Sequence, residues 1–194
     1  MRPTLASRTL EEFIALAKAT PGKLTYGSTG AGGSAHLISE WLASAAGVQL
    51  VHVPYKGMSP ALADLLSGQV DFTFVSYSTV GSHLKSGRLR ALAGSSAKRL
   101  SALPDLRTVA EAGFAGFDAN PWWGLAAPAG TPSAIVERIN ELAVRIMRLP
   151  DVESKFREVG IDIIGGTPAE ALTFLQRDTE RWTKIVRAVG AKAD

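Results

Sequence analysis

The stretch QLVHVPYKGMSPALADLLSGQVDFTFVS, residues 49–76, contains a complete strand–turn–helix–strand unit. Its two ends, 49–55 and 70–76, are rich in valine and aromatic residues, which favour strands. The segment 60–68 between them begins with a proline at a position that a helix tolerates. A helix of about ten residues between two such strands is typical of a βαβ crossover, so this stretch predicts an α/β fold with a buried, largely parallel sheet.

The same alternation continues on both sides of this unit. The sequence predicts, in order, a helix at 8–18, a strand at 24–26, a helix at 35–46 that ends at Gly47, a helix at 80–87, a strand at 89–96 and a short helix at 108–113. Thr9 is placed to cap the first of these helices. The rest of 97–121 is rich in proline and glycine, as turns are.

The C-terminal part of the chain follows a different pattern. It predicts a strand at 122–132, helices at 132–149 and 151–160, a strand at 161–166, and a final helix that is capped at Thr167 and runs toward Val189. The strand at 161–166 has no second strand nearby with which to pair. We therefore place a domain boundary near Pro121: residues 1–121 form one α/β domain, and residues 122–194 belong to a sheet most of whose strands are not in this chain.

Composition excludes several kinds of protein and site. The chain has 194 residues, of which 46% are hydrophobic and 20% charged, as in ordinary globular proteins. It has no cysteine, which excludes disulfides and cysteine nucleophiles, and no apolar run of the roughly 18 residues that a membrane span needs. The net charge of +3 is scattered and supports nucleic-acid binding only weakly. Residues 1–13 lack the apolar segment of a signal peptide, so the sequence alone predicts a cytoplasmic protein.

A glycine turn, GSTGAGGSAH at 27–36, leads from the strand at 24–26 into the next helix. Glycines let the backbone approach a ligand, and the open N–H groups at the start of a helix favour an anion such as a carboxylate. A plain strand-to-helix turn fits these residues equally well. The candidate ligand contacts in the turn are Ser28, Thr29, Gly30, Gly32, Gly33 and Ser34. His36 is expected to order the turn through a backbone hydrogen bond, or else to reach the ligand.

Two further groups of candidate contacts follow predicted strands, at the edge where open α/β sheets bind ligands. The first group is Tyr55, Lys56 and Gly57, and the second is Ser76, Tyr77 and Ser78. A lysine here could attract an anionic ligand, although most lysines in such turns are simply solvated.

The tryptophans divide into two pairs. Trp122 and Trp123 open a predicted strand, whose side chains alternate between faces, so one should face the cleft or hinge while the other packs. Trp123 is the candidate ligand contact. Trp41 and Trp182 lie within predicted helices and are expected to cover the core.

The sequence shows no pattern for catalysis, a cofactor or a metal. The glycine turn lacks the Gly-x-Ser-x-Gly sequence of a hydrolase, and its glycines miss the spacing of a dinucleotide fingerprint. Asp71 begins a strand and so lies at the wrong edge of the sheet for the site. His52 and His83 have no acidic or histidine partner at metal-binding spacing. These observations disfavour a hydrolase, a nucleotide-binding protein and a metal site.

Several segments, in this order and at these distances, resemble one family. They are PGKLTYGSTGAGGSAHL at 21–37, HVPYKG at 52–57, ALADLLSGQVDFTF at 61–74, LKSGRLRALAGSSAKRLSALPD at 84–105, TVAEAG at 108–113 and WWGLAAPAGTP at 122–132. Over essentially its whole length, the chain resembles the extracytoplasmic solute-binding receptors of tripartite tricarboxylate transporters, the Bug-type receptors. The resemblance implies a fold like that of type II periplasmic binding proteins, in which two α/β domains close on a small carboxylate and leave it chemically unchanged.

The resemblance also implies a location and partners. It implies a periplasmic receptor that serves membrane transporter subunits, with residues 1–121 as its second, middle domain and 122–194 as the C-terminal part of its first. Members of the family carry a signal peptide and about a third of the mature chain ahead of the matching segments, so we expect this chain to lack that N-terminal third. Gly33 stands where the family usually has serine, and 75–76 and 78–79 also depart from its pattern, so specificity is not expected to be inherited unchanged.

Two alternatives to a transport receptor stay open. The same two-domain fold serves as the effector-binding or sensory module of transcription regulators, although residues 1–20 contain no basic helix-turn-helix. A truncated chain could also bind nothing and persist as a homo-oligomer that pairs its unpaired strand edges.

Overall fold

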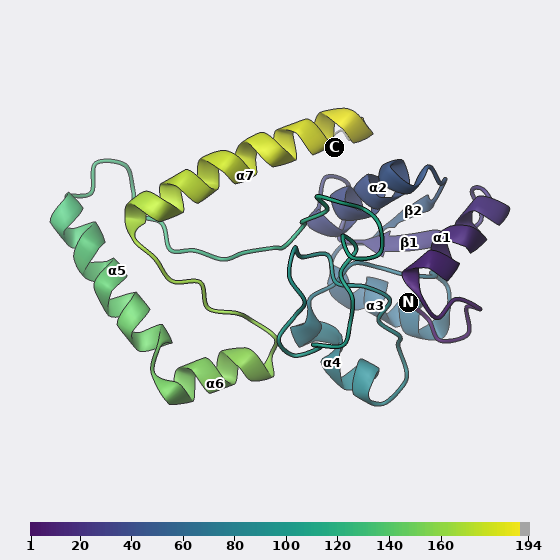
Figure 1. Ribbon diagram of the computed structural model, residues 1–194, viewed down its shortest axis with the longest axis horizontal. Coiled ribbons are helices and arrows are strands. Elements are labelled where there is room, and N and C mark those ends of the chain that lie inside the picture. Colours follow the sequence, from purple (N-terminus) through teal and green to yellow (C-terminus); the bar gives the residue numbers. More distant parts are fainter. Residues whose placement is uncertain (191–194) are drawn as a thin grey trace.

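The computed structural model describes residues 1–190 (Figure 1). Its helices and strands are, in chain order, α1 (Leu10–Ala19), β1 (Thr25–Ser28), α2 (Ser34–Ala46), β2 (Val51–Pro54), α3 (Met58–Ser67), α4 (Tyr77–Lys85), α5 (Ser133–Met147), α6 (Pro150–Glu158) and α7 (Pro168–Val189). Residues 1–121 gather into a body around the two strands (Figure 1). Residues 122–180 extend away from the body as an arm, and the end of α7 returns to lie along α2 (Figure 1).

The body contains the predicted parallel pair of strands. β1 and β2 lie side by side, with Thr25 opposite Val51 and Ser28 opposite Pro54, so the α/β fold is confirmed. The predicted third strand at 70–76 is wrong in extent, because it makes only a single parallel bridge, from Phe72 to Tyr26. Beyond this bridge the Thr73 hydroxyl donates to the carbonyl of Gly27 at 2.8 Å. The Gly27 carbonyl therefore accepts a side-chain hydrogen bond at the point where the next backbone hydrogen bond between the two segments would form.

Two other predicted elements are also wrong. The segment 89–96 makes one parallel bridge, from Gly94 to Thr108, in place of a strand. The segment 108–113 begins as a helix would, since the backbone N–H of Glu111 donates to the Thr108 hydroxyl at 3.1 Å. Gly113 then adopts a φ of +108°, which ends the turn before a helix forms.

Helix ends follow the predicted capping residues. Thr9 accepts the backbone N–H of Glu12 at 3.2 Å and caps α1. Gly47 ends α2 in the left-handed conformation, with a φ of +62°. Thr167 and Glu170 form a reciprocal capping box at the start of α7. These termini are therefore specified by local sequence.

Two apolar clusters hold the body together. The larger cluster joins α1, β1 and α2 through Phe13, Tyr26 and Leu42, each of which is almost fully buried. The smaller cluster includes Leu65 of α3 and Val70. The clusters fix α2 and α3 against the strands, and so fix the points where these helices begin.

Tryptophans attach α7 to the body. The ring of Trp41 in α2 stacks on Phe117 with 4.1 Å between ring centroids, and it meets Trp182 of α7 edge-on at 6.3 Å. Both tryptophans pack against the larger cluster, as predicted from their helical positions. The contact between α2 and α7 therefore rests on the C-terminal half of α7.

The arm exposes most of its apolar side chains. Among the described residues, neither α5 nor α6 has a buried side chain. The segments 122–132 and 161–166, predicted as strands of a sheet that lies mostly outside this chain, form no strand here, because residues 1–190 supply no neighbouring strand that would complete their hydrogen bonds. Leu125 and Ile164, at the centres of these segments, are 81% and 76% exposed. Within residues 1–190, no helix combines the length and apolar character needed to cross a membrane.

Candidate functional site

The ends of β1 and β2 bring the first two predicted groups of ligand contacts together. Ser28 and Pro54 are opposite each other in the register, and the next backbone N–H, that of Tyr55, donates to the Ser28 carbonyl at 3.0 Å. A Cβ atom on Gly27 would lie 3.5 Å from the Tyr55 ring. The glycine turn and residues 55–57 therefore share one edge of the sheet.

Steric contacts require glycine within the glycine turn. Gly30 and Gly32 adopt φ angles of +120° and +75°, which side chains rarely tolerate. A Cβ atom on Gly33 would lie 2.9 Å from the Thr29 hydroxyl oxygen and 3.2 Å from the Gly30 carbonyl oxygen. The turn is thus folded tightly on itself and presents main chain rather than side chains.

The helices that start beside this edge have open N-termini. α2, α3 and α4 follow Gly33, Gly57 and Ser76, and none of these residues caps its helix through a side chain within the described structure. The first N–H groups of a helix have no partner within the helix and carry its positive partial charge. Such N–H groups can donate to an anion.

Ser28 and the two nearby histidines, His36 and His52, hold the glycine turn through hydrogen bonds. The Ser28 hydroxyl, which is fully buried, lies 2.6 Å from Nε2 of His52 and 3.1 Å from both the N–H and the carbonyl oxygen of Gly30. The N–H of Gly32 donates to Nδ1 of His36 at 3.0 Å. This is the backbone hydrogen bond that the sequence predicted for His36.

Two tyrosines support the strand ends with hydrogen bonds to carboxylates. Tyr26 donates to Glu40 at 2.5 Å and Tyr55 donates to Asp64 at 2.7 Å. Burial, followed by the hydrogen bond to Glu40, raises the pKa of Tyr26. Burial, followed by the hydrogen bond to Asp64, raises the pKa of Tyr55 to about 12. The Tyr55 hydroxyl therefore serves to anchor α3 beside the site.

Alkaline titration should detect this anchor. A phenol with a raised pKa is held neutral by the fold, so Tyr55 stabilises the protein fully below its unfolded pKa of about 10, and this stability is lost as the pH rises toward 12. Phenolate absorbance should show Tyr55 ionising near pH 12, and Tyr55→Phe should remove that step. Ionisation of every tyrosine near pH 10, while the protein remains folded, would contradict the arrangement.

The third predicted group lies at the start of α4 and includes a residue that contacts the arm. Ser76 precedes α4, and the ring of Tyr77 packs against Gly160, where a Cβ atom would lie only 2.6 Å from its Cδ1. Tyr77 therefore connects the body to the residues that follow α6. Ser78 is exposed on α4, Ser34 is exposed at the start of α2, and Thr29 and Lys56 are exposed in their turns.

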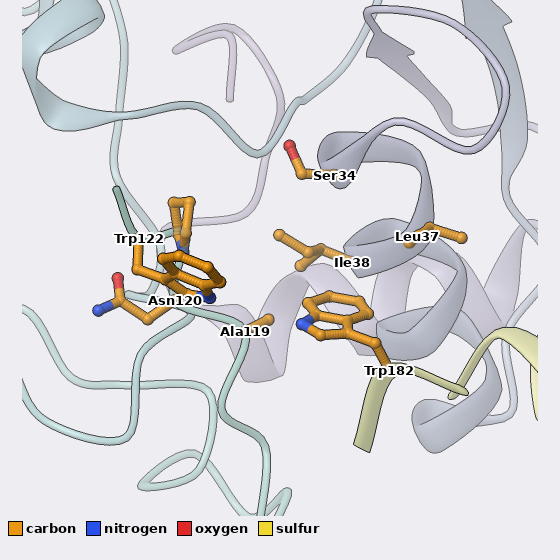
Figure 2. Close-up of a pocket in the computed structure, with 8 residues that line it drawn as sticks. Ser34, Leu37, Ile38, Ala119, Asn120, Trp122 and Trp182 are labelled. Atoms are coloured by element: carbon orange, nitrogen blue, oxygen red, sulfur yellow. The ribbon is translucent and has the colours of Figure 1, made fainter. Parts of the chain in front are cut away.

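A hollow of about 290 Å³ opens beside Ser34 (Figure 2). It lies between α2, the segment that leaves the body and α7, and its lining residues are Ser34, Leu37, Ile38, Ala119, Asn120, Pro121, Trp122 and Trp182. Of these residues, only Ser34 was predicted from the sequence as a ligand contact. Leu37 and Ile38 could have been found, because they follow Ser34 by one helical turn and share its face.

The neighbouring tryptophans Trp122 and Trp123 differ in their surroundings. The indole N–H of Trp122 donates to Asp178 at 2.9 Å and its ring meets Phe174 edge-on, whereas Trp123 is 70% exposed. Trp122 lines the hollow (Figure 2), although 38% of its surface stays exposed. Within residues 1–190, no group of three or more histidine, cysteine, aspartate or glutamate side chains is placed to hold a metal ion.

Comparison with known proteins identifies the family. Residues 1–191 match the family described as tripartite tricarboxylate transporter family receptor. The UPF0065 protein in the tcbD-tcbE intergenic region of Pseudomonas sp. strain P51 is 39% identical over 180 residues, which cover 92% of this chain and 54% of that protein. The chain therefore spans about half the length of that relative.

Solved structures share the fold as well. R. palustris Rpa4515, solved with adipate, superposes with a TM-score of 0.88 and 32% identity over 97% of this chain and 63% of its own. MatC (Rpa3494) from Rhodopseudomonas palustris, solved with bound malate, gives a TM-score of 0.79 and 27% identity over 95% of this chain and 64% of its own. Family match, sequence identity and fold agree, and the chain belongs to the receptor family of the tripartite tricarboxylate transporters.

Proposed function

We propose that this chain is part of a periplasmic solute receptor and that its glycine turn holds a carboxylate group of a small organic acid. The observation that carries the proposal is the meeting of the open N-termini of α2 and α3 at one edge of the sheet. Adipate and malate, which are present in two structures of the same fold, are both dicarboxylates. Backbone N–H groups suit this ligand, since hydrogen bonds to a charged group contribute about 1.5–3 kcal/mol each.

The turn residues divide into donors and supports in this proposal. Thr29 and Ser34 have exposed hydroxyls that can donate to the ligand, and exposed Lys56 adds positive charge nearby. The Ser28 hydroxyl already makes hydrogen bonds to Gly30 and His52, so it stabilises the turn instead of contacting the ligand. The ligand is bound and released without a change in its covalent bonds.

The remainder of the receptor completes the site in the whole protein. We place the division between the two domains near Pro121, so that the arm belongs to the first domain and the other wall of the cleft comes from residues outside this chain. Trp123, which is exposed in this chain, is then available to that cleft. The closed receptor would present its ligand to the membrane subunits of a tripartite transporter.

We expect the isolated chain to bind small carboxylates only weakly. One wall of a cleft, with a few N–H donors, supports affinities near the millimolar range, equivalent to about 4 kcal/mol. Titration calorimetry and amide chemical shifts should show such binding for succinate, aspartate, adipate or benzoate. Gly33→Val should weaken it by roughly tenfold or more, because its side chain would displace Thr29.

Gly94→Ala is the matched control for this variant, since its Cβ atom would meet nothing nearer than 4.0 Å. Its affinity should equal that of the original chain. Sub-micromolar binding by the isolated chain would show that the site is already complete within it. Equal affinity of Gly33→Val and the original chain would remove the glycine turn from the site.

The exposed arm leads us to propose that the isolated chain self-associates. Leu125, Ile164 and Leu172 are 81%, 76% and 61% exposed, and apolar surface of this kind favours contact with another copy. Light scattering should show a mass that rises with concentration, and Ile164→Ser together with Leu172→Ser should reduce the rise. A single monomeric mass at all concentrations would contradict self-association.

A further inference from the structure

We propose that His36 and His52 are positioning residues that set the glycine turn in its binding conformation before the ligand arrives. The inference rests on the proposed function, because it concerns how the same turn is held. Each imidazole holds one glycine of the turn. His52 contacts the Ser28 hydroxyl, which in turn accepts the Gly30 N–H, and His36 accepts the Gly32 N–H directly.

The hydrogen bonds of Ser28 assign the proton on His52. A hydroxyl has one hydrogen to donate and two lone pairs with which to accept. We assign the hydroxyl hydrogen of Ser28 to the Gly30 carbonyl and one of its lone pairs to the Gly30 N–H, so that its other lone pair accepts a proton carried by Nε2 of His52. This arrangement satisfies all the contacts of the buried hydroxyl at once.

The contact with Gly32 assigns the opposite role to His36. Its Nδ1 accepts the Gly32 N–H at 3.0 Å, so in the neutral imidazole the proton lies on Nε2. His36 therefore presents an acceptor to the turn, whereas His52 presents a donor. Replacing His36 by an apolar side chain would leave the Gly32 N–H without this acceptor, and replacing His52 would remove one donor from the Ser28 hydroxyl.

Stacking holds both imidazoles in these orientations. The rings of His36 and His52 are parallel within 15° with centroids 4.2 Å apart, and the His52 ring also stacks on Tyr26 at 5.0 Å. Tyr26 is itself fixed, since it is fully buried and donates to Glu40 of α2. A column from Glu40 through Tyr26 and His52 to His36 thus connects α2 and both strands to the turn.

Substitutions at His36 can separate the effect of its hydrogen bond to Gly32 from the effect of its ring stacking on His52. His36→Asn keeps an acceptor at the δ position but loses the ring, while His36→Phe keeps a ring but loses the acceptor. We expect His36→Phe to accelerate hydrogen exchange of the Gly32 amide and to weaken adipate binding, each by roughly 3- to 10-fold, which is the range for one hydrogen bond. His36→Asn should restore both. His83→Phe, on α4, is the matched control and should change neither.

The measurements use the 194-residue chain, with adipate as the probe and amide chemical shifts as the readout. Imidazole ¹⁵N shifts of the unsubstituted chain should show Nε2–H for both His36 and His52, which tests the assignment even if a variant fails to fold. Finding Nδ1–H on His36, or equal exchange of Gly32 in all variants, would overturn the proposal. If adipate shifts no amide at any concentration, the proposed function fails for this chain, and Gly32 exchange still decides whether His36 positions the turn.

Discussion

Asp71→Ala is expected to destabilise the protein by about 2–4 kcal/mol, because Asp71 is the buried carboxylate that joins the start of the chain to β1. It is 6% exposed, and its oxygens accept from Arg2 Nε at 2.9 Å, the Thr25 N–H at 2.8 Å and the Thr25 hydroxyl at 3.1 Å. Alanine would leave the Thr25 N–H and the Arg2 guanidinium without their acceptor. Urea denaturation should show a lower midpoint with an unchanged slope.

Asp105→Ala provides the control for Asp71→Ala, because it removes the same charge from an exposed position. Its effect should stay within about 0.5 kcal/mol. Equal stability of the two variants would show that the network around Asp71 contributes nothing beyond surface charge. Asp71 lies at the start of its segment, away from the ligand edge, so this network stabilises the sheet rather than taking part in binding.

Phe13→Ala should cost about 3–5 kcal/mol, the largest loss that we expect from a single truncation. Phe13 is 1% exposed in the larger apolar cluster, and its ring meets Phe72 edge-on with 4.9 Å between centroids. Phe72 is also the residue that forms the bridge to Tyr26. The cavity would therefore weaken both α1 and the attachment of the third segment to the sheet.

Phe13→Leu separates shape from hydrophobicity in this experiment. It keeps most of the buried apolar surface and should cost less than about half as much as alanine. Thermal and urea unfolding of both variants would measure the difference. A loss below about 1 kcal/mol for Phe13→Ala would mean that α1 does not pack against the sheet as the structure has it.

Local signals in the sequence predicted the helices well and overstated the strands. Thr9, Gly47 and Thr167 define helix ends through contacts within a few residues, which the sequence displays directly. A strand depends on a partner that is distant in the chain, and β-prone residues at 122–132 and 161–166 cannot show whether one is present. These segments form no strand for that reason, and Leu125 and Ile164 within them are exposed.

The candidate site was predictable in its backbone and less so in its side chains. The glycines of the turn and the order of strand and helix indicated an open helix start without any knowledge of packing. The stacking of His36 on His52 depends on the register of β2 beside β1, so the sequence near either residue does not predict it. Trp122 contacts Asp178 and Phe174 while Trp123 is 70% exposed, although the strand whose alternation predicted such a contrast does not form in the described residues.

The attachment of α7 at one end gives this helix the geometry of a lever. Its C-terminal half is fixed to α2 through Trp182 and Trp41, while its other end contacts α5 in the arm. A helix of 22 residues is roughly 33 Å long at 1.5 Å per residue. Trp182 lies 14 residues from Pro168, roughly 21 Å along the helix, so a pivot of about 10° at the tryptophans would move the far end by roughly 4 Å. A change in indole packing that is small at Trp182 would therefore displace the start of α7 by several times as much.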